Sequence, residues 1–73
     1  MKLSNIPFED IVIGQRVQSD TDSTQGAVEA KRINYFAQDL FRNEVIILWD
    51  GHKELSLAWH LWCNEITVVE ETK

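Results

Sequence analysis

The stretch Glu44-Val-Ile-Ile-Leu-Trp-Asp-Gly51 decides the fold class of this chain. Its apolar run, mostly β-branched, is typical of a strand. The Asp-Gly dipeptide that follows supplies the positive φ angles that a tight hairpin turn requires. Residues 53–58 then alternate between polar and apolar side chains, as a returning strand with one solvated face does. The stretch therefore predicts an antiparallel hairpin at the centre of the fold.

The segments on either side of this hairpin extend the β pattern. Residues 15–18 predict a short first strand, residues 65–70 predict a last strand, and the polar run at 19–26 predicts a loop. Residues 26–43 fit two structures. They read as a strand over 26–33 followed by a loop, but Ala30, Ile33, Ala37 and Leu40 also recur at helical spacing. We therefore predict an all-β fold of about five strands, with an α+β sheet carrying one helix at about residues 26–42 as the alternative.

Length and cysteine content limit the organisation of the chain. Seventy-three residues support one small domain, which we place at residues 1–73. The single cysteine, Cys63, excludes an internal disulfide, and small secreted domains usually depend on disulfides. We therefore expect a reducing, cytoplasmic location.

Charge and hydropathy exclude further classes of protein. Seven Lys and Arg against twelve Asp and Glu give a net charge of −5, which disfavours nonspecific binding to nucleic acid. The longest apolar run, at residues 45–49, is far too short to span a membrane. The sequence thus predicts neither a nucleic-acid partner nor a membrane partner.

Four short motifs carry a resemblance to a known fold. They are Gly14-Gln-Arg-Val17, Gly26-Ala-Val28, Val45-Ile-Ile-Leu-Trp-Asp-Gly51 and Glu65-Ile-Thr-Val-Val69. Their order resembles that of small SH3-like barrels, which include tudor, KOW and chromo-type modules. The resemblance implies a small barrel of about five strands. In tudor-like modules an aromatic cage binds methylated side chains through cation–π attraction, but the sequence alone does not assign the aromatic residues of this chain to the positions of such a cage.

The central strand is apolar on both of its faces. Because side chains alternate along a strand, Val45, Ile47 and Trp49 form one row, and Ile46 and Leu48 form the other. The returning strand offers only one apolar row, so one row of the central strand needs another cover. That cover is the helix of the alternative fold, a loop of the same chain, or another chain. We interpret the row of Val45, Ile47 and Trp49 as part of a partner-binding surface.

An aromatic stretch near the C-terminal end supplies the rest of this surface. Trp59 and Trp62 are three residues apart, so they share one face if the segment forms a helical turn. Tryptophan is also enriched at binding hot spots. We add both residues to the predicted surface, whereas Tyr35, Phe36 and Phe41 are expected in the core.

Residues for metal binding or catalysis are few. His52, His60 and Cys63 are the only soft metal ligands, and a structural zinc site needs four. We expect no metal and no cofactor, with His60 packed against the tryptophans and Cys63 a buried, inert thiol. Ser23 and Ser56 lack the flanking glycines of a nucleophile elbow, so no catalytic residue is predicted.

These observations predict a small non-enzymatic interaction module that binds protein, either another protein or a second copy in a homodimer. One alternative is a nucleic-acid-associated protein of the KOW or tudor type, which the net charge disfavours. Another is a small enzyme whose site forms only at an oligomer interface.

Overall fold

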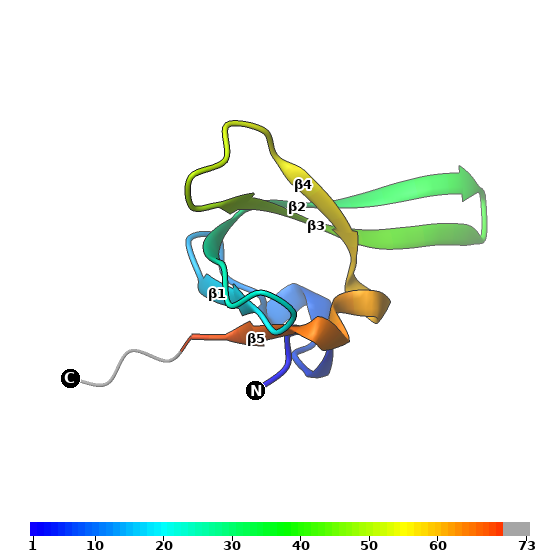
Figure 1. Cartoon of the computed structure of the whole chain (residues 1–73). Helices are drawn as coiled ribbons and strands as arrows, with labels where there is room; N and C mark the ends of the chain where they lie inside the picture. The colour runs from blue at the N-terminus through cyan, green and yellow to red at the C-terminus, as the bar shows by residue number, and fades with distance from the viewer. Residues whose placement is uncertain (70–73) are drawn as a thin grey trace.

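The protein is a five-stranded antiparallel sheet with three short 3₁₀ segments, as a computed structural model describes it for residues 1–69 (Figure 1). The strands follow the order β4-β3-β2-β1-β5. They are β1 (Arg16–Ser19), β2 (Gln25–Ala37), β3 (Leu40–Trp49), β4 (Ser56–Trp59) and β5 (Ile66–Val68). The 3₁₀ turns are η1 (Leu3–Asn5), η2 (Phe8–Asp10) and η3 (His60–Glu65). The small all-β fold predicted from the sequence is confirmed, although Glu70, the end of the predicted last strand, lies outside the described residues.

The sheet curls but does not close into the predicted barrel. Its edge strands, β4 and β5, form no ladder with each other within residues 1–69. The chain between them forms η3, and the N-terminal turns lie on the open side of the curl (Figure 1). Val68 holds this N-terminal segment, because its N–H donates to the carbonyl of Met1 at 2.9 Å. Short 3₁₀ turns thus take the place that a ladder between β4 and β5 would occupy.

The turn after β3 is wider than predicted. Gly51 has the predicted positive φ, at +81°, but Asp50 does not. However, β4 begins at Ser56 rather than at Lys53, and its pairing with β3 ends at Ile47↔Ser56. Beyond Ile47, β3 is paired only on its other edge, with β2 as far as Gly26↔Trp49. The returning strand is therefore shorter than the alternating pattern predicts.

Residues 26–43 form most of a long hairpin, so the predicted helix at about 26–42 is wrong. β2 continues to Ala37, and only Gln38 and Asp39 separate it from β3. The predicted loop after residue 33 is therefore strand as well. Bulges between Val28 and Ala30 and between Tyr35 and Ala37 interrupt the regular pairing. Bulges disturb the period-two pattern of a strand, which explains why this segment also fits a helix.

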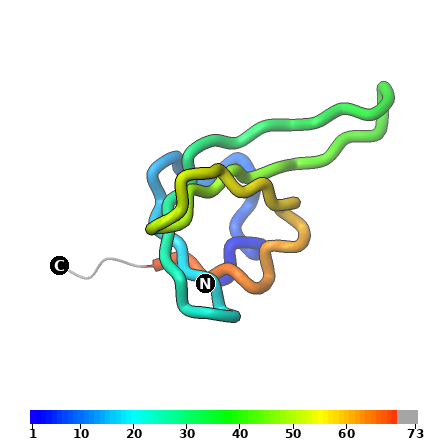
Figure 2. Tube along the Cα trace, turned by 45° about the horizontal axis from the view of Figure 1, so that its top comes forward, coloured from blue at the N-terminus to red at the C-terminus, as the bar shows by residue number. Residues whose placement is uncertain are grey.

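The distal part of this hairpin projects beyond the rest of the sheet (Figures 1 and 2). β1 pairs with β2 only as far as Ala27, and β4 pairs with β3 only from Glu44 onward. Residues 33–43, which we call the arm, are therefore two-stranded and make the molecule 42 Å long.

The core receives the row of β3 that was predicted to face a partner. Val45 and Ile47 are fully buried, and Trp49 is partly buried against them. The interpretation of Val45 and Ile47 as partner-binding residues is corrected, because the core covers both side chains. That of Trp49 stays a prediction. The buried core consists of Leu3, Ile11, Val17, Val28, Val45, Ile47 and Cys63.

The close approach of β2 to β3 at Gly26 generates a stability prediction. A Cβ atom there would lie 2.7 Å from the carbonyl oxygen of Leu48 and 2.8 Å from Cε3 of Trp49. We expect Gly26→Ala to destabilise the fold by about 1–3 kcal/mol and to lower Tm by on the order of 10 °C, measured by thermal unfolding. Ala37→Ser, at the exposed end of β2, serves as the control and should leave Tm nearly unchanged. Equal melting of both variants and the wild type would contradict the close packing.

Candidate protein-interaction surface

The arm exposes several large apolar side chains that no other element covers. Tyr35 and Phe41 are cross-strand partners whose rings lie 5.8 Å apart, yet more than half of each residue is exposed. The expectation that these residues and Phe36 belong to the core is wrong, because the arm extends past every element that would cover it. The exposed apolar residues of the arm are Ile33, Tyr35, Phe36, Leu40 and Phe41.

A second exposed apolar group lies where β4 passes into η3. The rings of Trp59 and Trp62 stack with centroids 4.7 Å apart and an interplanar angle of 25°. This confirms the prediction that the two residues share a face. Trp59 is partly buried, whereas Trp62 is 72% exposed and Leu61 is 81% exposed. Of the five predicted partner-binding residues, Trp59 and Trp62 are the two at the surface near the arm.

A groove of about 470 Å³ joins the arm to this aromatic pair. We call it the arm groove, and it is lined by Phe36, Leu40, Phe41, Arg42, Asn43, Trp59 and Leu61. Its walls come from both strands of the arm and from the β4–η3 junction. A single charged side chain, that of Arg42, is among the lining residues.

Arg42 connects the two halves of the surface. Its guanidinium carbon lies 4.2 Å from the ring centroid of Trp59 and 4.9 Å from that of Phe36. Its Nε donates to Glu44 at 2.6 Å. Arginine stacks well on aromatic faces because its charge is delocalised over a plane. The Arg42 side chain therefore fixes the position of the arm relative to Trp59.

Glu44, whose side chain is completely buried, holds Arg42 in this position. Arg32 donates to one carboxylate oxygen at 2.5 Å, and Arg42 donates to the other at 2.6 Å. Burial opposes ionisation of Glu44, but the hydrogen bonds from the two arginines outweigh that effect and hold its pKa below the ordinary value. In the sheet Glu44 lies opposite both Arg32 and Trp59. It thus ties β2, β3 and β4 together at the base of the arm.

His60 and Cys63 contact different parts of the protein. The Nε2 of His60 lies 2.7 Å from the carbonyl of Ile6 and 3.2 Å from that of Leu3. Because both neighbours are acceptors, Nε2 carries the proton and donates it. The ring packs beside Phe8 at 5.8 Å, which corrects the prediction that it packs against the tryptophans.

The thiol of Cys63 is buried and donates to the carbonyl of Trp59 at 3.1 Å. Burial raises the pKa of this thiol to about 11. Within residues 1–69, no three His, Cys, Asp or Glu side chains are grouped closely enough to hold a metal ion.

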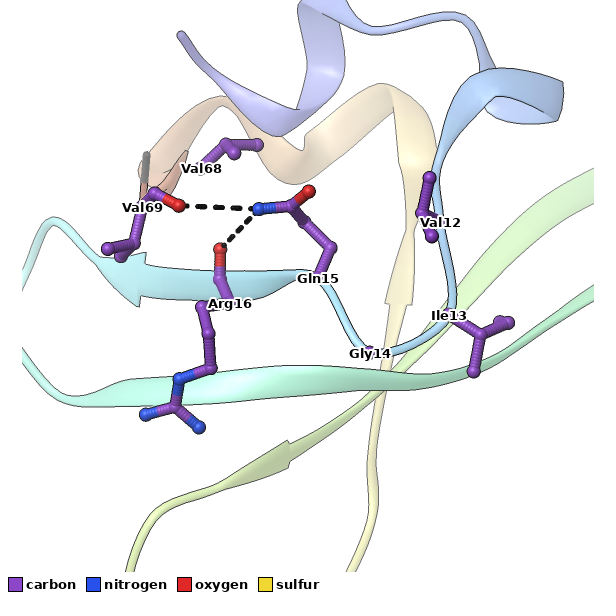
Figure 3. A pocket seen from close by; sticks show the side chains of 7 residues that line it. All are labelled: Val12, Ile13, Gly14, Gln15, Arg16, Val68 and Val69. Atoms are coloured by element: carbon purple, nitrogen blue, oxygen red, sulfur yellow. Dashed lines mark hydrogen bonds between the residues drawn. The ribbon is translucent and has the colours of Figure 1, made fainter. Parts of the chain in front are cut away.

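A wider hollow of about 720 Å³ lies between the loop before β1 and the end of β5 (Figure 3). Its polar side chains are already engaged. The amide of Gln15 donates to the carbonyls of Arg16 at 3.2 Å and Val69 at 3.3 Å, and Arg16 forms an ion pair with Asp50 at 2.6 Å. The other lining residues are Val12, Ile13, Gly14 and Val68, none of which has a reactive side chain.

A third hollow, of about 270 Å³, brings together a serine, a histidine and an aspartate. Ser56, His52 and Asp22 all line it, but no hydrogen bond links the three in the described part of the chain. Asp22 instead accepts a hydrogen bond from the backbone N–H of Thr24 at 3.0 Å, and this bond lowers its pKa. The geometry therefore contains no nucleophile–base relay at this position.

Sequence reasoning missed the arm residues and the Arg32–Glu44–Arg42 cluster. One signal was present, because the polar pair Gln38-Asp39 lies between Phe36 and Leu40. A two-residue polar break between apolar segments is typical of a hairpin loop. It would have identified the arm.

Comparison of the chain with protein-family models, curated proteins and solved structures finds no match. In the described range, no helix is long and apolar enough to cross a membrane. The candidate surface therefore rests on its own geometry.

The environment of Cys63 predicts slow reaction with thiol reagents. With a pKa of about 11, on the order of 0.1% of the thiol is ionised at pH 8, and the sulfur is also sterically covered. We expect labelling by a disulfide reagent to be at least about a hundredfold slower in native buffer than in urea, followed by absorbance. Rapid labelling of the native protein would show that η3 opens readily.

The Glu44 cluster predicts a specific dependence of stability on pH. Because the folded-state pKa of Glu44 is below its unfolded value near 4.5, its ionic stabilisation is complete above that value. The stabilisation is lost as the pH falls through the folded pKa. We expect Glu44→Gln to reduce the free energy of unfolding at pH 7, and the difference from wild type to shrink below about pH 4.

Urea unfolding of both proteins between pH 7 and pH 3 measures this difference. Asp20 and Asp50 also have lowered pKa values, but they are present in both proteins and cancel in the comparison. Stability curves that stay parallel over the whole range would contradict the role of Glu44.

Proposed function

We propose that this protein is a small, non-enzymatic interaction module that binds another protein chain through the arm, the arm groove and the Trp59–Trp62 pair. The observation that carries the proposal is the exposed apolar surface of the arm. An isolated two-stranded hairpin is marginally stable in water, so an arm of this length gains from a partner that covers it. Large exposed apolar patches mark interaction sites in soluble proteins.

The composition of the surface supports protein as the ligand. Tryptophan, tyrosine and arginine dominate binding hot spots, and Trp62, Tyr35 and Arg42 all lie in or beside the arm groove. A buried aromatic side chain covers about 150–250 Å². The exposed parts of the rings and of the leucines beside them therefore approach the roughly 800 Å² that one partner contributes to a standard interface.

Binding of a methylated side chain, which the tudor resemblance implies, receives no support from this surface. The two rings that would attract a cation there, those of Phe36 and Trp59, already face Arg42 of the same chain. Binding of nucleic acid is also disfavoured. The two arginines near the arm, Arg32 and Arg42, both form ion pairs with Glu44. The chain as a whole has a net charge of −5, which repels phosphate groups.

Site-specific photo-crosslinking tests the proposal. We expect benzoylphenylalanine in place of Leu40, at the arm, to crosslink a discrete protein in an extract of the native host. The same photoreactive residue in place of Leu55, which is equally exposed but lies in the loop after β3, is the matched control. The arm-specific product should disappear when excess wild-type protein competes, but not when the Phe36→Ala/Phe41→Ala variant competes. Identical products from both positions, or none from the arm, would refute the proposal.

A further inference from the structure

We propose that the partner of the arm is a second copy of this chain, which pairs with the open edge of β3 at residues 40–43 and makes one sheet continuous across a two-fold dimer. This inference rests on the proposed function and names the partner of the same surface. β4 pairs with β3 from Ile47 only as far as Glu44, and after Trp59 the chain turns into η3. Leu40–Asn43 therefore has no neighbouring strand on that side within the described residues.

The other edge of the arm, on β2, is the less suitable of the two. On the arm, β2 carries a bulge between Tyr35 and Ala37, and the charged residues Lys31 and Arg32 immediately precede the arm. Bulges and charged side chains are the features by which proteins protect strand edges from pairing. Lys31 is also engaged, because its Nζ donates to the carbonyl of Phe8 at 3.1 Å. The β3 edge has no bulge and borders the apolar arm groove.

The symmetry of a dimer restricts the register. Two identical antiparallel strands are related by a two-fold axis perpendicular to the sheet, which leaves every side chain on its own face. The axis must therefore pass midway between one residue and the same residue of the second copy. An axis at Arg42 would place like charges opposite each other, and an axis at Leu40 would pair the strand with the turn at Gln38 and Asp39.

An axis beside Asn43 would place Arg42 opposite Glu44, whose outer edge is already paired with Trp59. An axis beside Phe41 avoids this conflict, the facing of like charges and the pairing with the turn. Phe41 then lies opposite Phe41 of the second copy, and Leu40 lies opposite the aliphatic stem of Arg42. The tip of each arm is directed toward the groove of the other, so that Asp39 lies opposite Asn43. No like charges face each other in this register, and the exposed rings of Phe41 from both arms meet.

The same register explains how the arm groove is filled. The groove extends from the arm to Trp59 and Leu61, which lie on the side where the second copy's tip would arrive. The tip of the second copy, Gln38 and Asp39, then lies near Leu61, which is 81% exposed in one chain. The interface contains the arm and the β4–η3 junction twice, once from each chain. A two-fold interface requires this self-complementary use of one patch.

Mass in solution tests the inference, measured by light scattering behind a sizing column at micromolar and at hundreds of micromolar protein. We expect the wild type to dimerise over this range. We expect both Phe41→Lys and Phe41→Glu to weaken dimerisation by at least about tenfold, because each places like charges opposite each other at the axis. An equimolar mixture of F41K and F41E should restore a dimer, since opposite charges then meet. Restoration also shows that both variants are folded.

Leu55→Lys is the matched control, because it makes the same charge change at an equally exposed leucine outside the arm. It should dimerise like the wild type. A wild type that is monomeric at every concentration, an F41K variant that dimerises normally, or a mixture that stays monomeric would overturn the inference. A monomeric wild type that still gives an arm-specific crosslink to another protein would retain the proposed function and reject only the second copy. If the wild type neither dimerises nor gives an arm-specific crosslink, both the proposed function and the dimer are rejected.

Discussion

The buried carboxylate of Glu44 is the interaction on which the projecting arm depends. Placing an ionised group out of water is unfavourable unless its oxygens are fully paired. Here Arg32 and Arg42 each bind one oxygen, so the charge is compensated from both strands of the hairpin. Buried ion pairs often add little net stability, but they disfavour arrangements in which a charge is left alone. Slippage of β2 against β3 would separate Glu44 from Arg32, so the pair fixes the register at the base of the arm.

This constraint extends from the backbone to the surface. With Nε held by Glu44, the guanidinium of Arg42 lies close to the rings of both Phe36 and Trp59. Trp59 in turn stacks on Trp62. A buried charge in the sheet therefore orients an exposed aromatic array through one arginine. Such preorganisation reduces the side-chain entropy lost on binding, which is a major cost of forming an interface.

The sequence predicted the parts of the fold that depend on local pattern. The strand at Val45–Trp49, the positive φ at Gly51 and the shared face of Trp59 and Trp62 all follow from spacing and turn chemistry. The inward direction of the Val45 and Ile47 row did not follow, because its cover comes from Leu3 and other residues distant in sequence. The arm also escaped prediction, since bulges obscure its strand pattern and exposed aromatic residues are expected in cores.

Aliphatic residues form the buried core of this small chain, whereas most of its aromatic residues lie at the surface. Every member of the fully buried core is an aliphatic residue or Cys63, and none of the seven aromatic residues belongs to it. Aromatic side chains have the largest apolar area of any residue and would contribute most to a core if folding alone determined their position. Most of them lie instead on the arm and at the β4–η3 junction, where folding gains little from them. The proposed association would account for their placement, because it would bury them in an interface.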